Sequence, residues 1–119
     1  MSYKITATDE KISAALDNVG LPVFYGEVPE DQLNGYNFIY YKPSALRKNS
    51  INTYGQNVIV ILVTKLSDLD KEMQIIEEME SIKMQAVGDA QYNRYQIGET
   101  TEFINVVAYT FVRTIKRMC

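Results

Sequence analysis

The 119-residue chain contains no histidine and only one cysteine, Cys119, at its last position. Zinc sites are built mainly from His and Cys, so this chain lacks the usual zinc ligands. Nucleophilic catalysis needs a base beside the nucleophile, and no histidine is present to serve as that base. The six glycines are scattered singly, whereas loops that bind phosphate need clustered glycines in front of a helix. We therefore expect no enzymatic activity, no cofactor and no metal.

Long apolar runs are also missing, and the charge is nearly balanced. No stretch of about 18 apolar residues occurs, so we expect no membrane-spanning helix and no membrane partner. The 12 Lys and Arg residues face 15 Asp and Glu residues, a net charge of −3, so the chain as a whole lacks the basic excess of nucleic-acid-binding domains. A hydrophobic fraction of 46% and this length predict a single domain spanning residues 1–119.

The first half of the chain predicts one helix followed by two strands. Apolar residues at helical spacing predict a helix over residues 8–18, with capping-box spacing at residues 6–9 and a stop at Gly20 and Pro22. Residues 22–28 form a short predicted strand. After the turn dipeptide at residues 34–35, the aromatic segment 36–41 predicts a second strand that Pro43 ends.

The second half predicts a central strand, a long helix and a closing strand pair. Six consecutive aliphatic residues within 57–64 indicate a strand that is buried on both faces. A helix is predicted over residues 68–86, capped by Ser67, with an inward face formed by Leu69, Met73, Ile76, Met79 and Ile82. Residues 92–97 and 103–114 then predict an antiparallel hairpin.

The predicted order is α-β-β-β-α-β-β, in the α+β class. We expect a single mixed, mainly antiparallel sheet with two helices on one face. Helical and strand periodicity places twelve residues in its core: Ile12, Leu16, Val19, Phe38, Val58, Val60, Leu62, Met73, Ile76, Ile82, Val107 and Tyr109.

Acidic pairs in the sequence do not indicate an acid-base site. Such a site needs two carboxyl groups that converge on a cleft with separated pKa values. Glu77 and Glu78 are instead predicted on the solvent side of the second helix, where a solvated charged surface is the simpler interpretation.

The charges are unevenly distributed along the chain. No acid lies between Asp31 and Asp68, whereas this stretch carries several basic residues. Surfaces of opposite charge allow copies of one chain to pair head to tail, although ordinary surface scatter is the alternative. The basic candidates for partner binding are Arg47, Lys48, Arg113, Lys116 and Arg117, and the acidic ones are Glu27, Glu30 and Asp31.

Residues 44–55 form a polar interlude, read as a loop or as the tip of an extended hairpin. The segment has no acids, and it places Arg47 and Lys48 near Leu46, Ile51 and Tyr54, the remaining candidates for partner binding. Because its apolar content is too low to offset ordering entropy, we expect it to be mobile in a free subunit and ordered against a neighbour. A solvated hairpin tip without a partner is the alternative.

The sequence also resembles a known family. Residues 21–30 (LPVFYGEVPE) after an opening helix, residues 36–41 (YNFIYY), the strand-helix unit at 57–82 and the closing segment 103–116 together resemble the tail terminator, or tail-completion (head-tail joining), proteins of long-tailed bacteriophages. The resemblance covers nearly the whole chain and lies in element order and a few dipeptides.

This resemblance implies a small α+β subunit that forms a ring, commonly a hexamer. Such a ring caps the tail tube, ends its polymerisation and offers a surface to the head connector, while DNA passes through its lumen. It would lie at the head-proximal end of the virion tail, after assembly in the host cytoplasm. Another neck or head-tail connector protein is one alternative. A small-molecule-binding regulatory domain of ferredoxin-like type is another, although its βαββαβ order differs from the order predicted here.

Overall fold

The computed structural model describes residues 2–26, 37–66, 68–96, 99 and 101–118. Its elements follow the predicted order, with two short additional strands, β1 and β5. In chain order they are β1 (Ser2–Ile5), α1 (Asp9–Asp17), β2 (Val23–Tyr25), β3 (Phe38–Lys48), β4 (Thr53–Thr64), α2 (Leu69–Ser81), β5 (Gln85–Ala86), β6 (Gln91–Gln96) and β7 (Phe103–Met118).

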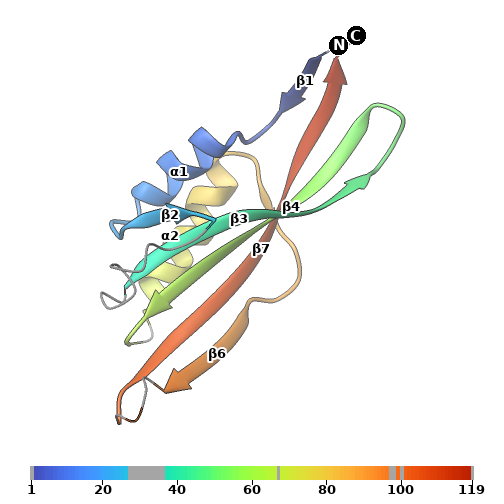
Figure 1. Cartoon of the computed structure of the whole chain (residues 1–119). Helices are drawn as coiled ribbons and strands as arrows, with labels where there is room; N and C mark the ends of the chain where they lie inside the picture. Colours follow the sequence, from blue (N-terminus) through green and yellow to red (C-terminus); the bar gives the residue numbers. More distant parts are fainter. Residues whose placement is uncertain (1, 27–36, 67, 97–98, 100, 119) are drawn as a thin grey trace.

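The seven strands form one mixed sheet in which β7 is the longest member. The path through the sheet is β1-β7-β4-β3-β2, and β5 and β6 also pair with β7. Among the strands of the described residues only β2 and β3 run parallel, whereas the other pairs are antiparallel. Both helices lie on the same side of this sheet (Figure 1). The predicted α+β class, mixed sheet and element order are therefore confirmed.

Strand β4 is central and has buried side chains on both faces, as its run of aliphatic residues predicts. Val58, Val60 and Leu62 are buried in the cluster that the sheet forms with the two helices. On the opposite face, Ile61 and Val63 are buried in a second cluster. Side chains of successive strand residues point to opposite faces, so burial on both faces requires a continuous aliphatic run.

Helix α1 begins one residue after its N-cap, Thr8. The Thr8 hydroxyl accepts a hydrogen bond from the Lys11 amide, while Ile12 and Leu16 are fully buried. The predicted cap at Thr6 is wrong, because the Thr6 hydroxyl is instead engaged with the backbone of Thr114 on β7. This contact joins the start of the chain to its last strand.

Helix α2 is shorter than predicted. It begins after the N-cap Asp68, whose carboxylate accepts from the Lys71 amide, while the predicted cap Ser67 lies outside the described residues. It ends at Ser81 rather than at residue 86, because Lys83 adopts a left-handed φ of 69°. Met84 then turns into the core, and β5 pairs with β7. Residues 85–86 thus gain sheet hydrogen bonds in place of helical ones.

The inward face of α2 is also rotated relative to the prediction. Glu72, Ile75 and Met79 are buried, whereas Leu69 and Met73 are 67% and 50% exposed. Placing Met73 in the core is therefore wrong. Ile76 and Ile82 are partly buried against the core, and the other nine predicted core residues are buried.

Strand β3 continues past Pro43, so the predicted end of this strand is wrong. Proline lacks an amide donor, but Pro43 lies beyond Tyr41, the last β3 residue paired with β2, where β3 is an edge strand. A register shift between Pro43 and Leu46 absorbs the local irregularity, and pairing with β4 then resumes. The interlude at residues 44–55 is therefore the tip of an extended hairpin, the second of the two structures that the sequence allows.

The remaining differences concern element ends. Strand β2 is described as far as Tyr25, and the predicted turn at residues 34–35 lies outside the described residues. Strand β7 runs to Met118, four residues beyond its predicted end. The predicted hairpin of β6 and β7 is confirmed. The long β7 and the extended β3–β4 hairpin give the molecule its elongated shape of 56 × 25 × 24 Å.

Candidate functional site

One end of the sheet projects beyond the helices, and we call it the basic arm. It consists of residues 2–5, 42–57 and 112–118, which belong to β1, the β3–β4 hairpin and the end of β7. Figure 1 shows it extending to the upper right, away from α1 and α2. None of these residues belongs to either buried hydrophobic cluster. The arm is therefore held by strand pairing, not by the core.

Hydrogen bonds close the tip of the arm and tie it to β7. The amides of Asn49 and Ser50 both donate to the carbonyl of Thr53, at 3.0 and 3.2 Å. The Arg117 amide on β7 donates to the carbonyl of Asn52 at 2.8 Å. These bonds connect the turn to the neighbouring strand, so the tip has a defined shape in the single chain.

A glycine on β4 gives Arg47 its place on the arm surface. A Cβ at Gly55 would lie 2.9 Å from Nδ2 of Asn49 and 3.4 Å from the Arg47 guanidinium. Because glycine leaves this space open, the guanidinium lies across the strand pair and donates to Oδ1 of Asn57 at 2.8 Å. Arg47 is therefore oriented in the single chain although its side chain is exposed.

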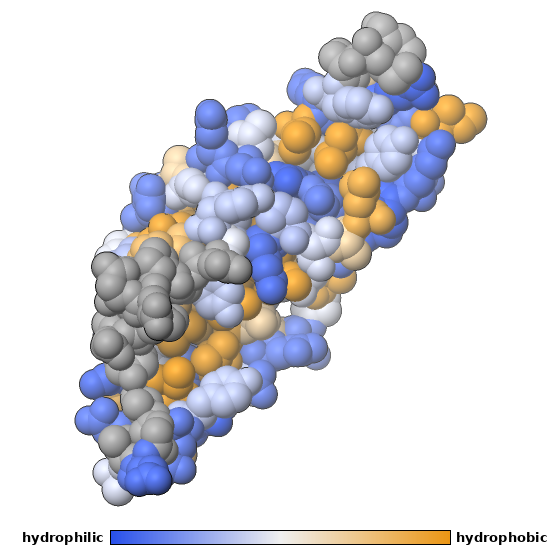
Figure 2. Space-filling view, in the orientation of Figure 1, coloured by the Kyte–Doolittle hydropathy of each residue, from blue (hydrophilic) through white to orange (hydrophobic). Residues whose placement is uncertain are grey.

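The arm is basic and partly apolar at its surface. Leu46 and Ile51 are 58% and 78% exposed. In Figure 2 hydrophobic and hydrophilic residues are interspersed over the arm. None of the 15 acidic residues lies on the arm, which carries seven of the 12 basic ones: Lys4, Lys42, Arg47, Lys48, Arg113, Lys116 and Arg117.

Arg113 is a structural residue at the base of the arm, unlike the other candidates. Its side chain is only 6% exposed and forms an ion pair with Asp9 at 2.8 Å. It also donates to the Ala7 carbonyl at 3.0 Å and twice to Oε1 of Gln56, at 3.0 and 2.8 Å. Arg113 thereby connects β7, β4 and the start of α1, and it is not available to a partner. Among the other candidates Lys48 and Lys116 are exposed, and Tyr54 and Arg117 are half-buried.

The acidic candidates Glu27, Glu30 and Asp31 lie outside the described residues. The described structure offers another acidic surface, on the outward side of α2, which we call the acidic helix face. It is defined by Leu69, Asp70, Met73, Glu77 and Glu80, all of which are exposed. Positions 70, 73, 77 and 80 follow the i, i+3, i+7 spacing that places side chains along one side of a helix. The face therefore combines three carboxylates with two exposed apolar side chains.

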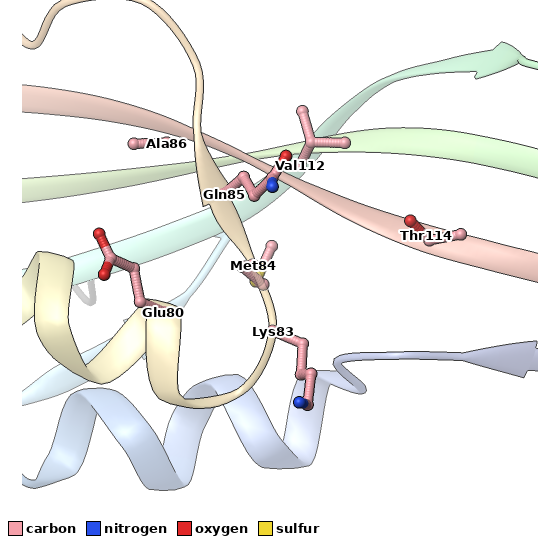
Figure 3. Close-up of a pocket in the computed structure, with 7 residues that line it drawn as sticks. All are labelled: Glu80, Lys83, Met84, Gln85, Ala86, Val112 and Thr114. Atoms are coloured by element: carbon pink, nitrogen blue, oxygen red, sulfur yellow. The ribbon is translucent and has the colours of Figure 1, made fainter.

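A groove of about 770 Å³ lies beside the end of this face. Seven residues of α2, the following turn, β5 and β7 line it (Figure 3). Its charged members are Glu80 and Lys83, and Figure 3 shows their charged ends pointing away from one another. The groove thus lacks a convergent pair of groups of the kind that acid-base catalysis requires.

The polar centre of the fold is Glu72 on α2. It is buried, and its Oε1 accepts hydrogen bonds from the hydroxyls of Tyr92 and Tyr109 at 2.6 and 2.7 Å. Burial and the bond to Glu72 raise the pKa of Tyr109, and the bond to Glu72 chiefly raises the pKa of Tyr92. No sequence signal identifies Glu72, since a glutamate among other charged residues fits a solvated face equally well.

A cavity of about 150 Å³ adjoins this cluster, and Asp68, Tyr92 and Arg94 are among its lining residues. Within the described ranges no group of three or more Asp, Glu, His or Cys residues is placed to hold a metal ion. None of the described helices is long and apolar enough to cross a membrane.

No protein-family model matches the chain, and no curated protein matches it. Among solved structures, the chain is similar to a component of the "Virion of native gene transfer agent (GTA) particle", with 10% sequence identity and a TM-score of 0.47. That match covers 92% of this chain and 87% of the other.

Proposed function

We propose that this protein is a bacteriophage structural subunit that works through contacts with other proteins and has no enzymatic activity. In this proposal, copies of the chain form a ring, of six subunits in the common arrangement, at the head-proximal end of the tail. The ring caps the tail tube, ends its polymerisation and presents a surface to the head connector, while DNA passes through the lumen.

The observation that supports this proposal is the separation of charge within one subunit. The basic arm has no acid, whereas the acidic helix face lies on the body of the molecule. A subunit that carries positive charge on one surface and negative charge on another favours head-to-tail contact between identical copies. A head-to-tail contact that closes on itself gives a ring. The sequence resemblance to tail terminator proteins adds the place of that ring in a virion.

Electron microscopy of tails assembled with and without this protein tests the function. We expect tails made with it to have a uniform length and to carry one additional ring at a single end. Antibody labelling should mark that end alone. Labelling distributed along the tube would contradict the proposal, as would normal tail length and head joining in its absence.

A second experiment separates the terminator from its nearest alternative, a connector-side neck protein. A terminator binds tails in the absence of heads, because its binding surface is the last ring of the tube. A connector-side protein would instead purify with DNA-filled heads in the absence of tails. Incubation of the purified protein with tails alone and with heads alone, followed by sedimentation, assigns it to one of the two.

A further inference from the structure

The basic arm and the acidic helix face match one another in both charge and apolar content. We propose that the arm of one copy docks on the acidic helix face of a second copy. This inference rests on the proposed ring and identifies the two surfaces that build it.

The apolar side chains are the first part of the match. Leu46 and Ile51 are exposed on the arm, and Leu69 and Met73 are exposed on α2. The hydrophobic spacing of α2 is typical of buried residues at 69 and 73, yet the single subunit leaves both in water. Docking of the arm would bury these side chains, and burial of apolar area is the main favourable term in association. The helix would then be covered on two sides, as its sequence pattern indicates.

The charged side chains are the second part of the match. Lys48 lies on the same face of β3 as Leu46, whereas Arg47 lies on the opposite face of the hairpin, against Gly55 and Asn57. Glu77 and Glu80 follow Met73 along α2. Solvent-exposed ion pairs add little affinity each, but complementary charges guide the encounter and fix the register of two surfaces. Arg47 is already oriented by its bond to Asn57, so less side-chain freedom is lost when it binds.

One subunit cannot make this contact with itself. The arm projects away from the helices, so its tip and the outward side of α2 are apart in the same chain (Figure 1). A contact between two different surfaces of identical copies leaves one arm and one helix face unpaired at the ends of any open chain. A closed ring pairs every one of them.

Charge reversal on either surface tests the proposal. The arm variant carries Arg47→Glu and Lys48→Glu, and the helix variant carries Glu77→Lys and Glu80→Lys. All four residues are exposed, so thermal unfolding should be nearly unchanged in both. Light scattering after size-exclusion chromatography should show assembly by the wild-type chain and its loss in each variant. Two exposed residues on α1 supply matched controls, Lys11→Glu and Asp17→Lys, and these should assemble like the wild type.

A chain with all four reversals supplies the decisive comparison. If the arm meets the helix face, its negative arm is complementary to its positive helix face, and assembly returns. Variants that assemble normally at low salt overturn the inference, and so does a folded four-fold variant that remains monomeric. A wild-type chain that stays monomeric up to its solubility limit overturns it as well.

Failure of this inference and failure of the proposed function remain distinguishable. If both double variants still form the terminal ring on tails, the ring stands and these two surfaces do not build it. If the wild-type protein is absent from the tail end, the proposed function fails whatever the charge variants do. Docking of the arm on the tube protein, rather than on a second copy, would appear as tail binding without self-assembly.

Discussion

At the scale of single residues, the buried carboxylate of Glu72 shows how this fold accommodates a charge. An isolated carboxylate in an apolar core is strongly unfavourable, so a buried one must accept hydrogen bonds. Tyr109 from β7 and Tyr92 from β6 supply them, at 2.7 and 2.6 Å. The three side chains join α2 to the sheet, and they orient the inward face of that helix.

The Tyr109 hydroxyl predicts a dependence of stability on pH. Its pKa is raised above the ordinary 10.0, chiefly by burial and then by the bond to Glu72. A group whose pKa is higher in the folded than in the unfolded chain contributes its full stability below the pKa of the unfolded chain. That contribution is lost as the pH rises above this pKa. The free energy of unfolding should therefore fall above pH 10.

Tyr109→Phe isolates this effect. Below pH 10 the variant should be less stable than the wild type by about 1 kcal/mol, because one hydrogen bond to Glu72 is lost. Above pH 10 the difference in unfolding free energy between the wild type and the variant should narrow. The wild type loses stability there through Tyr109, whereas phenylalanine has no proton to release and the variant does not. Urea denaturation at a series of pH values measures both. Val107→Ala, a buried change without a titrating group, serves as the control and should keep a constant difference. A Tyr109→Phe difference that also stays constant would contradict the assignment.

At the scale of elements, the orientation of α2 makes a measurable difference between two hydrophobic residues. Ile75 is fully buried, whereas Met73 is half exposed. Ile75→Ala should cost about 2–5 kcal/mol of unfolding free energy, because it removes buried methyl groups and leaves a cavity. Met73→Ala should change it by less than about 0.5 kcal/mol, as exposed substitutions usually do. Chemical denaturation of both variants tests which face of α2 is buried. Equal losses of unfolding free energy in the two variants would show that the buried face is assigned wrongly.

The elements differ in how far the sequence alone predicts them. The aliphatic run of β4 and the spacing of α1 are local patterns, and each identifies its element correctly. The end of α2 is not local, because residues 85–86 leave the helix to pair with β7. The two-residue β5 and the short β1 likewise depend on the long edge of β7, which a local pattern does not contain.

The same contrast holds for the candidate surfaces. The sequence alone places Arg47, Lys48, Leu46 and Ile51 close together, because they are neighbours on one hairpin, and their role in partner binding stays a prediction. It also groups Arg113 with the surface cations, although this side chain is buried and is bonded to Asp9 and Gln56. Both partners come from distant segments, so no spacing in the sequence indicates them. The exposure of Leu69 and Met73 likewise depends on which side of α2 meets the sheet.

At the scale of the whole molecule, stability and assembly are carried by different parts. The main buried cluster contains no residue of the arm and lies between the two helices and the body of the sheet. The arm adds strand pairing, and its base is fixed through Arg113 to Asp9 and Gln56. A subunit with its core at one end and an apolar, basic projection at the other has a surface that its own fold leaves unburied.

This division predicts that the arm can be shortened without loss of the fold. Replacing residues 46–55 by Asn-Gly, a dipeptide suited to two-residue hairpins, removes the tip with Arg47 and Lys48 but keeps Gln56 beside Arg113. Because no core residue is lost, we expect cooperative thermal unfolding and a circular dichroism spectrum of a folded α+β protein.

The shortened chain should nevertheless remain monomeric and fail to complete tails. Mixed in excess with the wild type, it still offers an intact acidic helix face, so it should bind one arm and block further addition. Normal assembly of the shortened chain would exclude the arm tip from the subunit contact, whereas loss of cooperative unfolding would show that the arm belongs to the folding core.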